Sequence, residues 1–149
     1  MMSKTDNQNK KNFIIQMSEE EKIIFIKILV ALAKTDNYFD DDEKTFIKDL
    51  ALTFGLNKSH IDEILIPLST EDVIKNASRI TNRQAALHLI KEACLLANSD
   101  GDLSDEEILF IGRIGQAMNV ELEKIEEISQ WVIERIIWLE RGKIILEQI

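Results

Sequence analysis

The sequence repeats itself without a gap at an offset of 64 positions, and this regularity limits the folds open to it. Turn and charged positions agree between the two copies as well as apolar ones. Helices of similar composition share apolar positions by chance, but they do not share turn residues in register. We therefore predict two helix–acidic turn–helix–helix units packed about a pseudo-twofold axis. The matched pairs include Ile26 with Ile90, Lys27 with Lys91, Ala33 with Ala97, Asp36 with Asp100, Asp41 with Asp105 and Glu43 with Glu107.

Capping patterns and apolar spacing predict an all-α fold of about seven helices. A Ser, Thr or Asp followed three residues later by an acid or Gln opens most segments, and apolar residues then recur at helical intervals. The third helix is expected to be capped by Asn57 or Ser59. The other capping pairs are Ser18 with Glu21, Asp40 with Glu43, Ser69 with Asp72, Thr81 with Gln84 and Ser104 with Glu107. Gly55 and Asn119 are expected to end helices, because both residue types tolerate a left-handed backbone. No segment alternates for long enough to indicate a strand. The predicted helices cover residues 18–34, 40–55, 57–66, 69–80, 81–97, 104–119 and 121–142 or beyond.

Length and charge indicate one acidic domain. A chain of 149 residues can bury a sizeable core. We expect residues 13–149 to form this core as a single domain, with the polar residues 1–12 as a disordered tail. The net charge of −9 disfavours nucleic acids and anionic membranes as partners, since both carry negative charge. Cations and basic partners are favoured instead.

The apolar segments and the cysteine content predict a cytoplasmic protein. The longest apolar run, Ile23–Ala33, is interrupted by Lys27 and is too short to cross a bilayer, so no integral membrane segment is expected. No apolar signal sequence precedes it. Cys94 is the only cysteine, which suits a reducing compartment and indicates a buried structural thiol.

The two acidic turns are candidate metal sites. Around Gly101, side-chain oxygens fall at most positions of an EF-hand calcium loop, but the first ligand position is Leu96. Its equivalent in the first unit is Leu32, so neither turn is predicted to be an EF-hand. A site shared between the turns remains open, with oxygen ligands suited to Ca²⁺, Mg²⁺ or Mn²⁺. The competing interpretation is that the carboxylates only cap helices. The predicted ligands are Asp36, Glu43, Asp100, Asp102 and Glu107.

No catalytic residues are predicted. His60 and His88 have no Cys or Glu at ligand spacing, so packing or surface roles are expected for both. The sequence contains no glycine-rich phosphate loop, nucleophile elbow or triad pattern. We therefore expect a protein that is not an enzyme. The alternative hypothesis is a metal-dependent hydrolase that uses the carboxylate cluster.

The segment ANSDGDLSDEE, from Ala97 to Glu107, follows an apolar helix and is duplicated. In these features the chain resembles the tellurite-resistance TerB-like family, from about Ile23 to Ser129. The resemblance implies an all-helical fold with an internal duplication, acting through acidic, candidate metal-binding sites and protein partners rather than catalysis. The first unit departs from the pattern at Tyr38, where an acid is common. The family's acidic positions fall on Asp36, Glu43, Asp100 and Glu107.

The last predicted helix is unusually apolar. A surface helix needs one apolar stripe, but at about 100° per residue this segment carries three. Two Trp residues suit an interface core, so the second stripe is predicted to bind a partner, with a homodimer as one form. Deep burial in the domain and contact with a membrane surface are the alternatives. The stripes are Ile125, Ile128, Val132, Ile136 and Leu139; Trp131, Trp138 and Ile145; and Ile133, Ile137 and Ile144.

Together these features predict a bacterial TerB-like protein of the stress-response or tellurite-resistance type. It would act as a protein-interaction module, with a divalent cation at the acidic turns as a candidate regulator. The alternatives are the metal-dependent hydrolase and a purely structural domain whose acids are all helix caps. The sequence names neither the partner nor the stress.

Overall fold

The computed structural model of the chain describes residues 14, 16–33, 41–66, 68–98 and 105–148, and these form helices with no strand. The all-α prediction is confirmed over this part of the chain, and so is the prediction of about seven helices. The predicted tail, residues 1–12, lies outside the described residues. The helices are α2 (Glu19–Ala33), α3 (Asp41–Thr53), α4 (Lys58–Ile64), α5 (Thr70–Ala77), α6 (Arg83–Ala97), α7 (Asp105–Ala117) and α8 (Leu122–Ile145).

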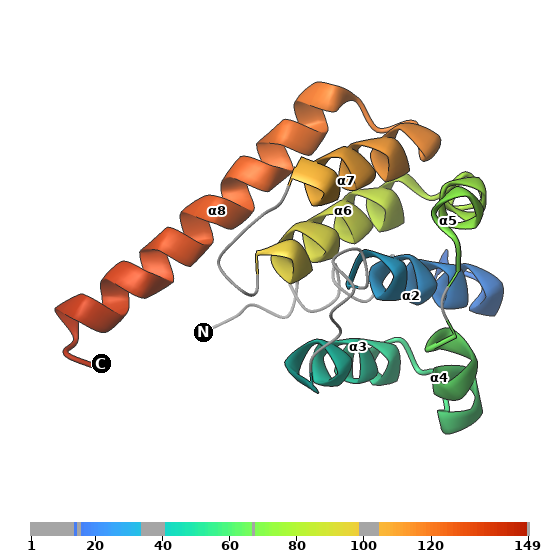
Figure 1. Cartoon of the computed structure of the whole chain (residues 1–149), viewed down its shortest axis with the longest axis horizontal. Coiled ribbons are helices and arrows are strands. Elements are labelled where there is room, and N and C mark those ends of the chain that lie inside the picture. The colour runs from blue at the N-terminus through green and yellow to red at the C-terminus, as the bar shows by residue number, and fades with distance from the viewer. Residues whose placement is uncertain (1–13, 15, 34–40, 67, 99–104, 149) are drawn as a thin grey trace.

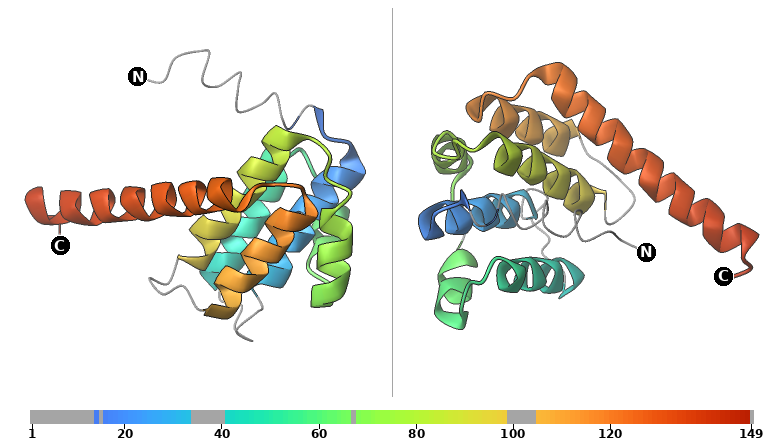
Figure 2. Two further views of the ribbon diagram at one scale, coloured as in Figure 1. Left: turned by 90° about the horizontal axis from the view of Figure 1, so that it is seen from above. Right: turned by 180° about the vertical axis from the view of Figure 1, so that it is seen from behind.

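Two apolar helices, α2 and α6, lie side by side at the centre of the fold (Figures 1 and 2). Around them, α2 packs against α3, α4 and α5, while α6 packs against α7 and α8. A helix enclosed on most sides must be apolar nearly all round, and both sequences satisfy this condition. Phe25 of α2 is fully buried and meets Phe54 edge to face, with ring centroids 4.9 Å apart. The hydrophobic core therefore lies along the contact between α2 and α6.

Side-chain caps fix where two of these helices begin. The Ser18 cap is as predicted, and of the two caps left open for α4, Asn57 and Ser59, the structure uses Asn57. At the start of α2 the Glu21 amide donates to Ser18 Oγ at 3.1 Å, and the Ser18 amide donates to Glu21 Oε1 at 3.3 Å. At the start of α4 the His60 amide donates to Asn57 Oδ1 at 3.1 Å. The Asn57 amide donates in turn to His60 Nδ1 at 3.4 Å, which completes a capping box.

The predicted cap of α6 is wrong by one residue. Thr81 with Gln84 fits a capping box in the sequence, but the side chain that accepts a helix amide belongs to Asn82. Asn82 Oδ1 accepts from the Ala85 amide at 3.0 Å, and the helix begins at Arg83. Asn and Thr are both good N-caps, so local sequence does not separate them, and here Asn82 also donates to Gln16 Oε1 at 2.6 Å.

Left-handed residues end α3 and α7 as predicted, and they do so in the same way. Gly55 has a φ of 79° and Asn119 a φ of 60°. Just after Gly55, the Leu56 amide donates to the Ala51 carbonyl at 3.0 Å. Just after Asn119, the Val120 amide donates to the Gly115 carbonyl at 2.9 Å. A hydrogen bond from the amide of one residue to the carbonyl of the residue five positions earlier is the Schellman motif. It gives a hydrogen-bond donor to a carbonyl that would otherwise lack one at the helix end.

The helix bounds recur at the offset seen in the sequence. That offset pairs the first and last residues of α2 with those of α6, and the first and last residues of α3 with those of α7. It also pairs Lys58, where α4 begins, with Leu122, where α8 begins. α8 then continues long past the position equivalent to Ile64, where α4 ends, so its extension has no counterpart in the first unit. A structural duplication stays a prediction, which a superposition of the two units would test.

We call the packed helices α2 to α7 the body of the protein. Only the first half of α8 packs on this body. Ile125 and Val132 are buried against α6 and α7, and Ile128 and Ile136 are partly buried against the same core. The helix then runs out past the other helices, so its last turns have none of them alongside (Figures 1 and 2). Within the described ranges, no helix is long and apolar enough to cross a membrane.

The central position of α6 leads to a stability prediction. Leu89→Ala removes a fully buried side chain from α6 and should destabilise the fold by about 2–5 kcal/mol, through lost burial and the cavity left behind. The matched control, Leu109→Ala on exposed α7 surface, should change stability by no more than about 0.5 kcal/mol. Urea denaturation followed by circular dichroism measures both. Equal effects would contradict the assigned core.

Candidate functional site

The structure describes two of the five predicted metal ligands. Glu43 lies half-buried in the first turn of α3, and Glu107 lies in the first turn of α7 with 9% of its surface exposed. Asp36, Asp100 and Asp102 lie outside the described residues. Among the residues that are described, no three His, Cys, Asp or Glu side chains are grouped to hold a metal. The divalent-cation site therefore stays a prediction.

The acidic first turns also suit the capping interpretation. α3 opens with Asp41, Asp42 and Glu43, and α7 opens with three acids in the same positions. Negative charge in the first turn interacts favourably with the helix dipole. Glu107 differs from a solvated acid, because a carboxylate so enclosed is stable only beside hydrogen-bond donors or a cation. Both roles are compatible with its position.

A titration separates these two roles. If the acidic turns bind a cation, calorimetry with Ca²⁺, Mg²⁺ or Mn²⁺ should give saturable heat at about millimolar concentration. Glu107→Gln should abolish that heat, because it removes a predicted ligand charge. Glu106→Gln makes the same change at the exposed neighbouring position and should leave binding intact. No heat with any of the three ions would remove the metal hypothesis.

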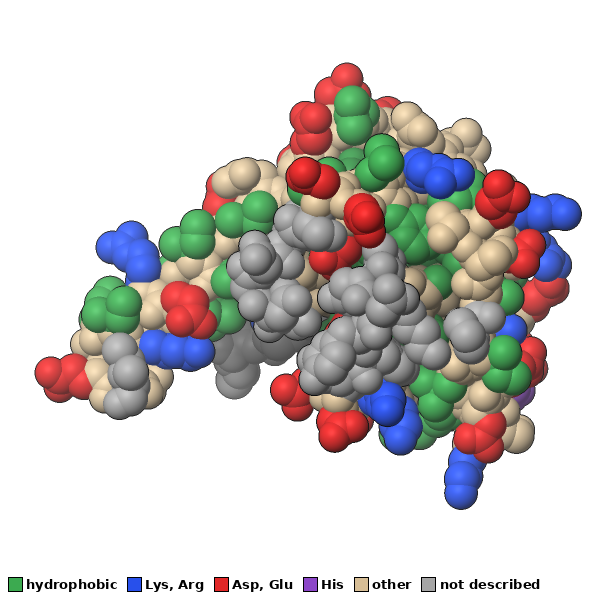
Figure 3. All heavy atoms as spheres, viewed as in Figure 1, with side chains coloured by type: hydrophobic (Ala, Val, Ile, Leu, Met, Phe, Trp, Pro, Cys, Tyr) green, Lys and Arg blue, Asp and Glu red, His purple; other side chains and the backbone are tan. Residues whose placement is uncertain are grey.

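The predicted interface stripe is exposed along α8. Trp131, Trp138 and Ile145 have 56%, 73% and 69% of their surfaces exposed. The first stripe packs on the core as far as Ile136, with Ile125 and Val132 buried and the others partly buried, and beyond it Leu139 is exposed. Figure 3 shows hydrophobic side chains on this part of the surface interleaved with acidic and basic ones. We call residues 131–146 the α8 extension.

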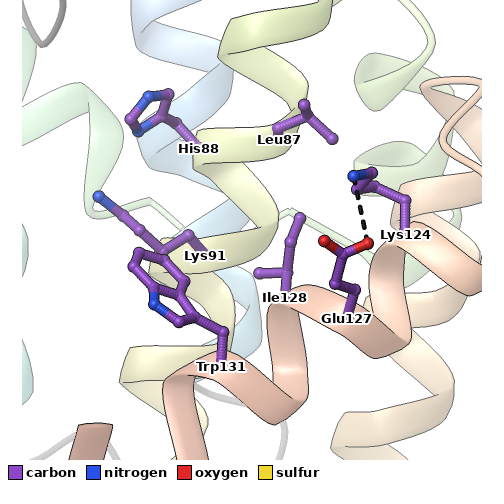
Figure 4. A pocket seen from close by; sticks show the side chains of 7 residues that line it. All are labelled: Leu87, His88, Lys91, Lys124, Glu127, Ile128 and Trp131. Atoms are coloured by element: carbon purple, nitrogen blue, oxygen red, sulfur yellow. Dashed lines mark hydrogen bonds and ion pairs between the residues drawn. The ribbon is translucent and has the colours of Figure 1, made fainter.

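A cavity of about 410 Å³ lies where α6 and α8 meet, at the inner end of the α8 extension (Figure 4). Its apolar wall includes Trp131, so the cavity adjoins the exposed stripe. Lys124 Nζ lies 3.2 Å from Glu127 Oε2, and Lys91 Nζ lies 3.2 Å from Glu92 Oε1. The cavity combines an apolar wall with a charged rim. Its lining is Leu87, His88 and Lys91 from α6, with Lys124, Glu127, Ile128 and Trp131 from α8.

Two more hollows follow the α8 extension. One, of about 600 Å³, lies between the extension and the end of α6 at Leu95 and Asn98. The other, of about 580 Å³, lies on the outer face and is lined by α8 and the turn after it. The outer face was only partly predicted: the sequence analysis named Ile137, Trp138 and Ile145 as members of apolar stripes, but it did not name the charged residues. The outer lining is Glu134, Ile137, Trp138, Arg141, Gly142, Ile145 and Leu146.

Polar contacts hold the first half of α8 on α6. Arg83 Nη2 donates to Glu121 Oε2 at 2.7 Å, and this bond lowers the pKa of the Glu121 carboxyl below its ordinary value. Farther along, Cys94 is buried as predicted. Burial raises the pKa of the Cys94 thiol to about 11, against the smaller lowering effect of its hydrogen bond with Ser129 of α8. These contacts set the direction in which α8 leaves the body.

The two histidines lie on different helices. His60 caps α4 and its Nε2 lies 2.8 Å from Glu19 Oε1. His88 lies on α6 at the rim of the cavity beside α8.

No family model, curated protein or solved structure matches this chain. The resemblance to the TerB-like family therefore rests on the acidic turns themselves.

The raised pKa of Cys94 predicts slow alkylation and a specific pH dependence. At pH 8 only about one thiol in a thousand is ionised, so iodoacetamide should label Cys94 far faster after denaturation. Since folding raises this pKa from 9.0 to about 11, the unfolded state loses its proton first. The stability of the wild type relative to Cys94→Ala should therefore fall between about pH 9 and pH 11. Thermal melts of both proteins check this, and a constant difference would contradict it.

Proposed function

We propose that this protein is an interaction module that binds a protein partner through the α8 extension. The observation that carries the proposal is the exposed apolar surface of a helix that has left its own core. Trp131, Trp138 and Ile145 each keep more than half of their surface in water. Isolated exposed apolar residues are ordinary, but here three large ones recur every seven residues on one helix face, and Trp is among the residue types most enriched at binding hot spots.

The length of α8 supports the same conclusion. The helix that begins at the equivalent position of the first unit, α4, ends at Ile64, whereas α8 runs to Ile145. A helical segment without tertiary contacts is only marginally stable in water. Residues added past the core therefore contribute little to folding. A partner that packs on them would provide the missing contacts.

The charge pattern of the extension favours a protein over a membrane or a nucleic acid. Glu134 and Glu140 alternate with Arg135, Arg141 and Lys143. Helices that lie on membranes are usually rich in Lys and Arg along the polar face. Nucleic acids need a basic surface, and this chain carries a net charge of −9. Mixed charges beside apolar residues suit another protein surface.

The family, the cellular role and the cation belong to the same proposal. The duplicated acidic turns and the recurrence of the helix bounds at the sequence offset support a TerB-like, cytoplasmic stress-response protein with a divalent cation as regulator. The hydrolase alternative rests on the sequence alone, since no observation on the described residues favours it. A purely structural domain does not account for the α8 extension.

Site-specific photo-crosslinking in cells of the source organism tests the proposal. A benzophenone amino acid at position 138 of the full chain should give covalent adducts with a protein, because Trp138 lies in the proposed surface. The control places it at Leu52 of α3, which is 60% exposed but lies away from α8. Adducts should be several times more abundant at position 138. Equal yields at both positions would overturn the proposal, and a chelator arm tests dependence on the cation.

A further inference from the structure

We infer that the partner of the α8 extension is a second copy of this chain, paired antiparallel about a twofold axis at Trp138. This inference rests on the proposed function, since it names the occupant of the same surface. The surface considered is the outer face of the extension, where Glu134, Trp138, Arg141 and Ile145 lie within about a quarter-turn of one another.

The apolar stripe is symmetric about Trp138. Trp131 lies seven residues before Trp138, and Ile145 lies seven residues after it. A twofold axis perpendicular to the helix at Trp138 therefore places Trp138 against the partner's Trp138. The same operation places Trp131 against the partner's Ile145 at both ends of the overlap. Every large apolar side chain of the stripe then meets another one.

The charges on this face select the antiparallel arrangement. Glu134 and Arg141 lie three to four residues on either side of Trp138. In an antiparallel pair, Glu134 lies opposite the partner's Arg141, and the contact occurs twice. In a parallel pair this flank of the stripe would meet the opposite flank of the partner helix, so Glu134 would not meet Arg141. The two Glu134–Arg141 contacts are therefore available only to the antiparallel pair, and they favour it.

The two protein bodies do not collide in this arrangement. At about 100° per residue, Glu134 and Arg141 lie roughly opposite to Ile125 and Val132 around the helix. Ile125 and Val132 are the buried residues that pack on the body. Each body therefore lies on the far side of its own α8, away from the partner helix. A twofold pair can close along the outer faces alone.

Gly142 provides room for the Trp138 rings. Side chains on a helix lean toward its N-terminus. In an antiparallel pair, each Trp138 indole therefore leans toward the partner's Gly142. A Cβ atom built at Gly142 meets nothing within 4 Å, so the surface there is open. Glycine inside an exposed helix costs about 1 kcal/mol of helix stability relative to alanine. Close approach of the partner's indole ring would explain why a residue without a side chain stands at this position.

The expected affinity is modest. The residues from Trp131 to Ile145 overlap over about 21 Å of helix, which makes a small interface. We therefore expect a dissociation constant in the micromolar range, on the order of 10 µM. Dimerisation should depend on protein concentration in that range.

Sedimentation equilibrium of the full chain between about 2 and 300 µM tests the inference. The wild type should pass from monomer to dimer. Glu134→Arg and Arg141→Glu should each weaken dimerisation about tenfold or more, because each sets like charges against one another across the pair. The double variant should restore it, because the opposite charges face each other again. Glu106→Arg, an exposed charge reversal on α7, is the control and should have no effect.

Engineered cysteines test the antiparallel register in a Cys94→Ala background. Trp138→Cys should oxidise to a disulfide-linked dimer on its own. Trp131→Cys and Ile145→Cys should each stay monomeric alone but should link to one another when mixed. Linkage of each variant to itself would indicate a parallel pair and overturn the inference.

The outcomes separate this inference from the proposed function. A wild type that is monomeric at about 300 µM overturns the self-pairing. Photo-adducts at position 138 with a different protein would then still support the proposed interaction module. A dimer that the charge reversals do not weaken forms through another surface, which also overturns the inference. A wild type that stays monomeric and gives no adducts at position 138 overturns both the self-pairing and the proposed function.

Discussion

The contact between α2 and α6 is the constraint on which the rest of the structure depends. Both helices are too apolar for a surface position, so each must be enclosed by neighbours. α3, α4 and α5 enclose α2, while α7 and the first half of α8 enclose α6. The outer helices need only one apolar face each, which leaves most acids of their first turns at the surface, with Glu107 as the buried exception. Cys94, buried on α6 under α8, shows how closely this packing excludes water.

α8 meets two different environments along its length. Ile125 and Val132 pack on the body, whereas Trp138 and Ile145 lie beyond it. The ion pair of Glu121 with Arg83 and the contact of Ser129 with Cys94 hold only the first half. The second half is therefore a surface presented by a fixed helix.

Local patterns predicted the helices well because caps and left-handed stops act within a few residues. Ser18 and Ser69 cap the helices they were expected to cap, Asn57 is the one used of the two caps left open for α4, and Gly55 and Asn119 end their helices. The error at the start of α6 came from two good caps in succession, of which Asn82 is the one used. For the acidic turns, Glu43 and Glu107 were placed, but a site shared between two turns depends on a distance between them. Local sequence patterns do not determine the distance between the two turns.

By itself, the sequence determined the helix count, the positions of most helix ends, the apolar character of α2 and α6, and the three stripes of the last helix. These properties follow from spacing along one chain, since a helix repeats about every 3.6 residues. The tertiary structure alone decided which stripe is core. Trp131 and Ile128 are similar in the sequence, but α6 covers Ile128 and leaves Trp131 more than half exposed. Burial depends on where the neighbouring helix ends in space, and only the packed chain fixes that position.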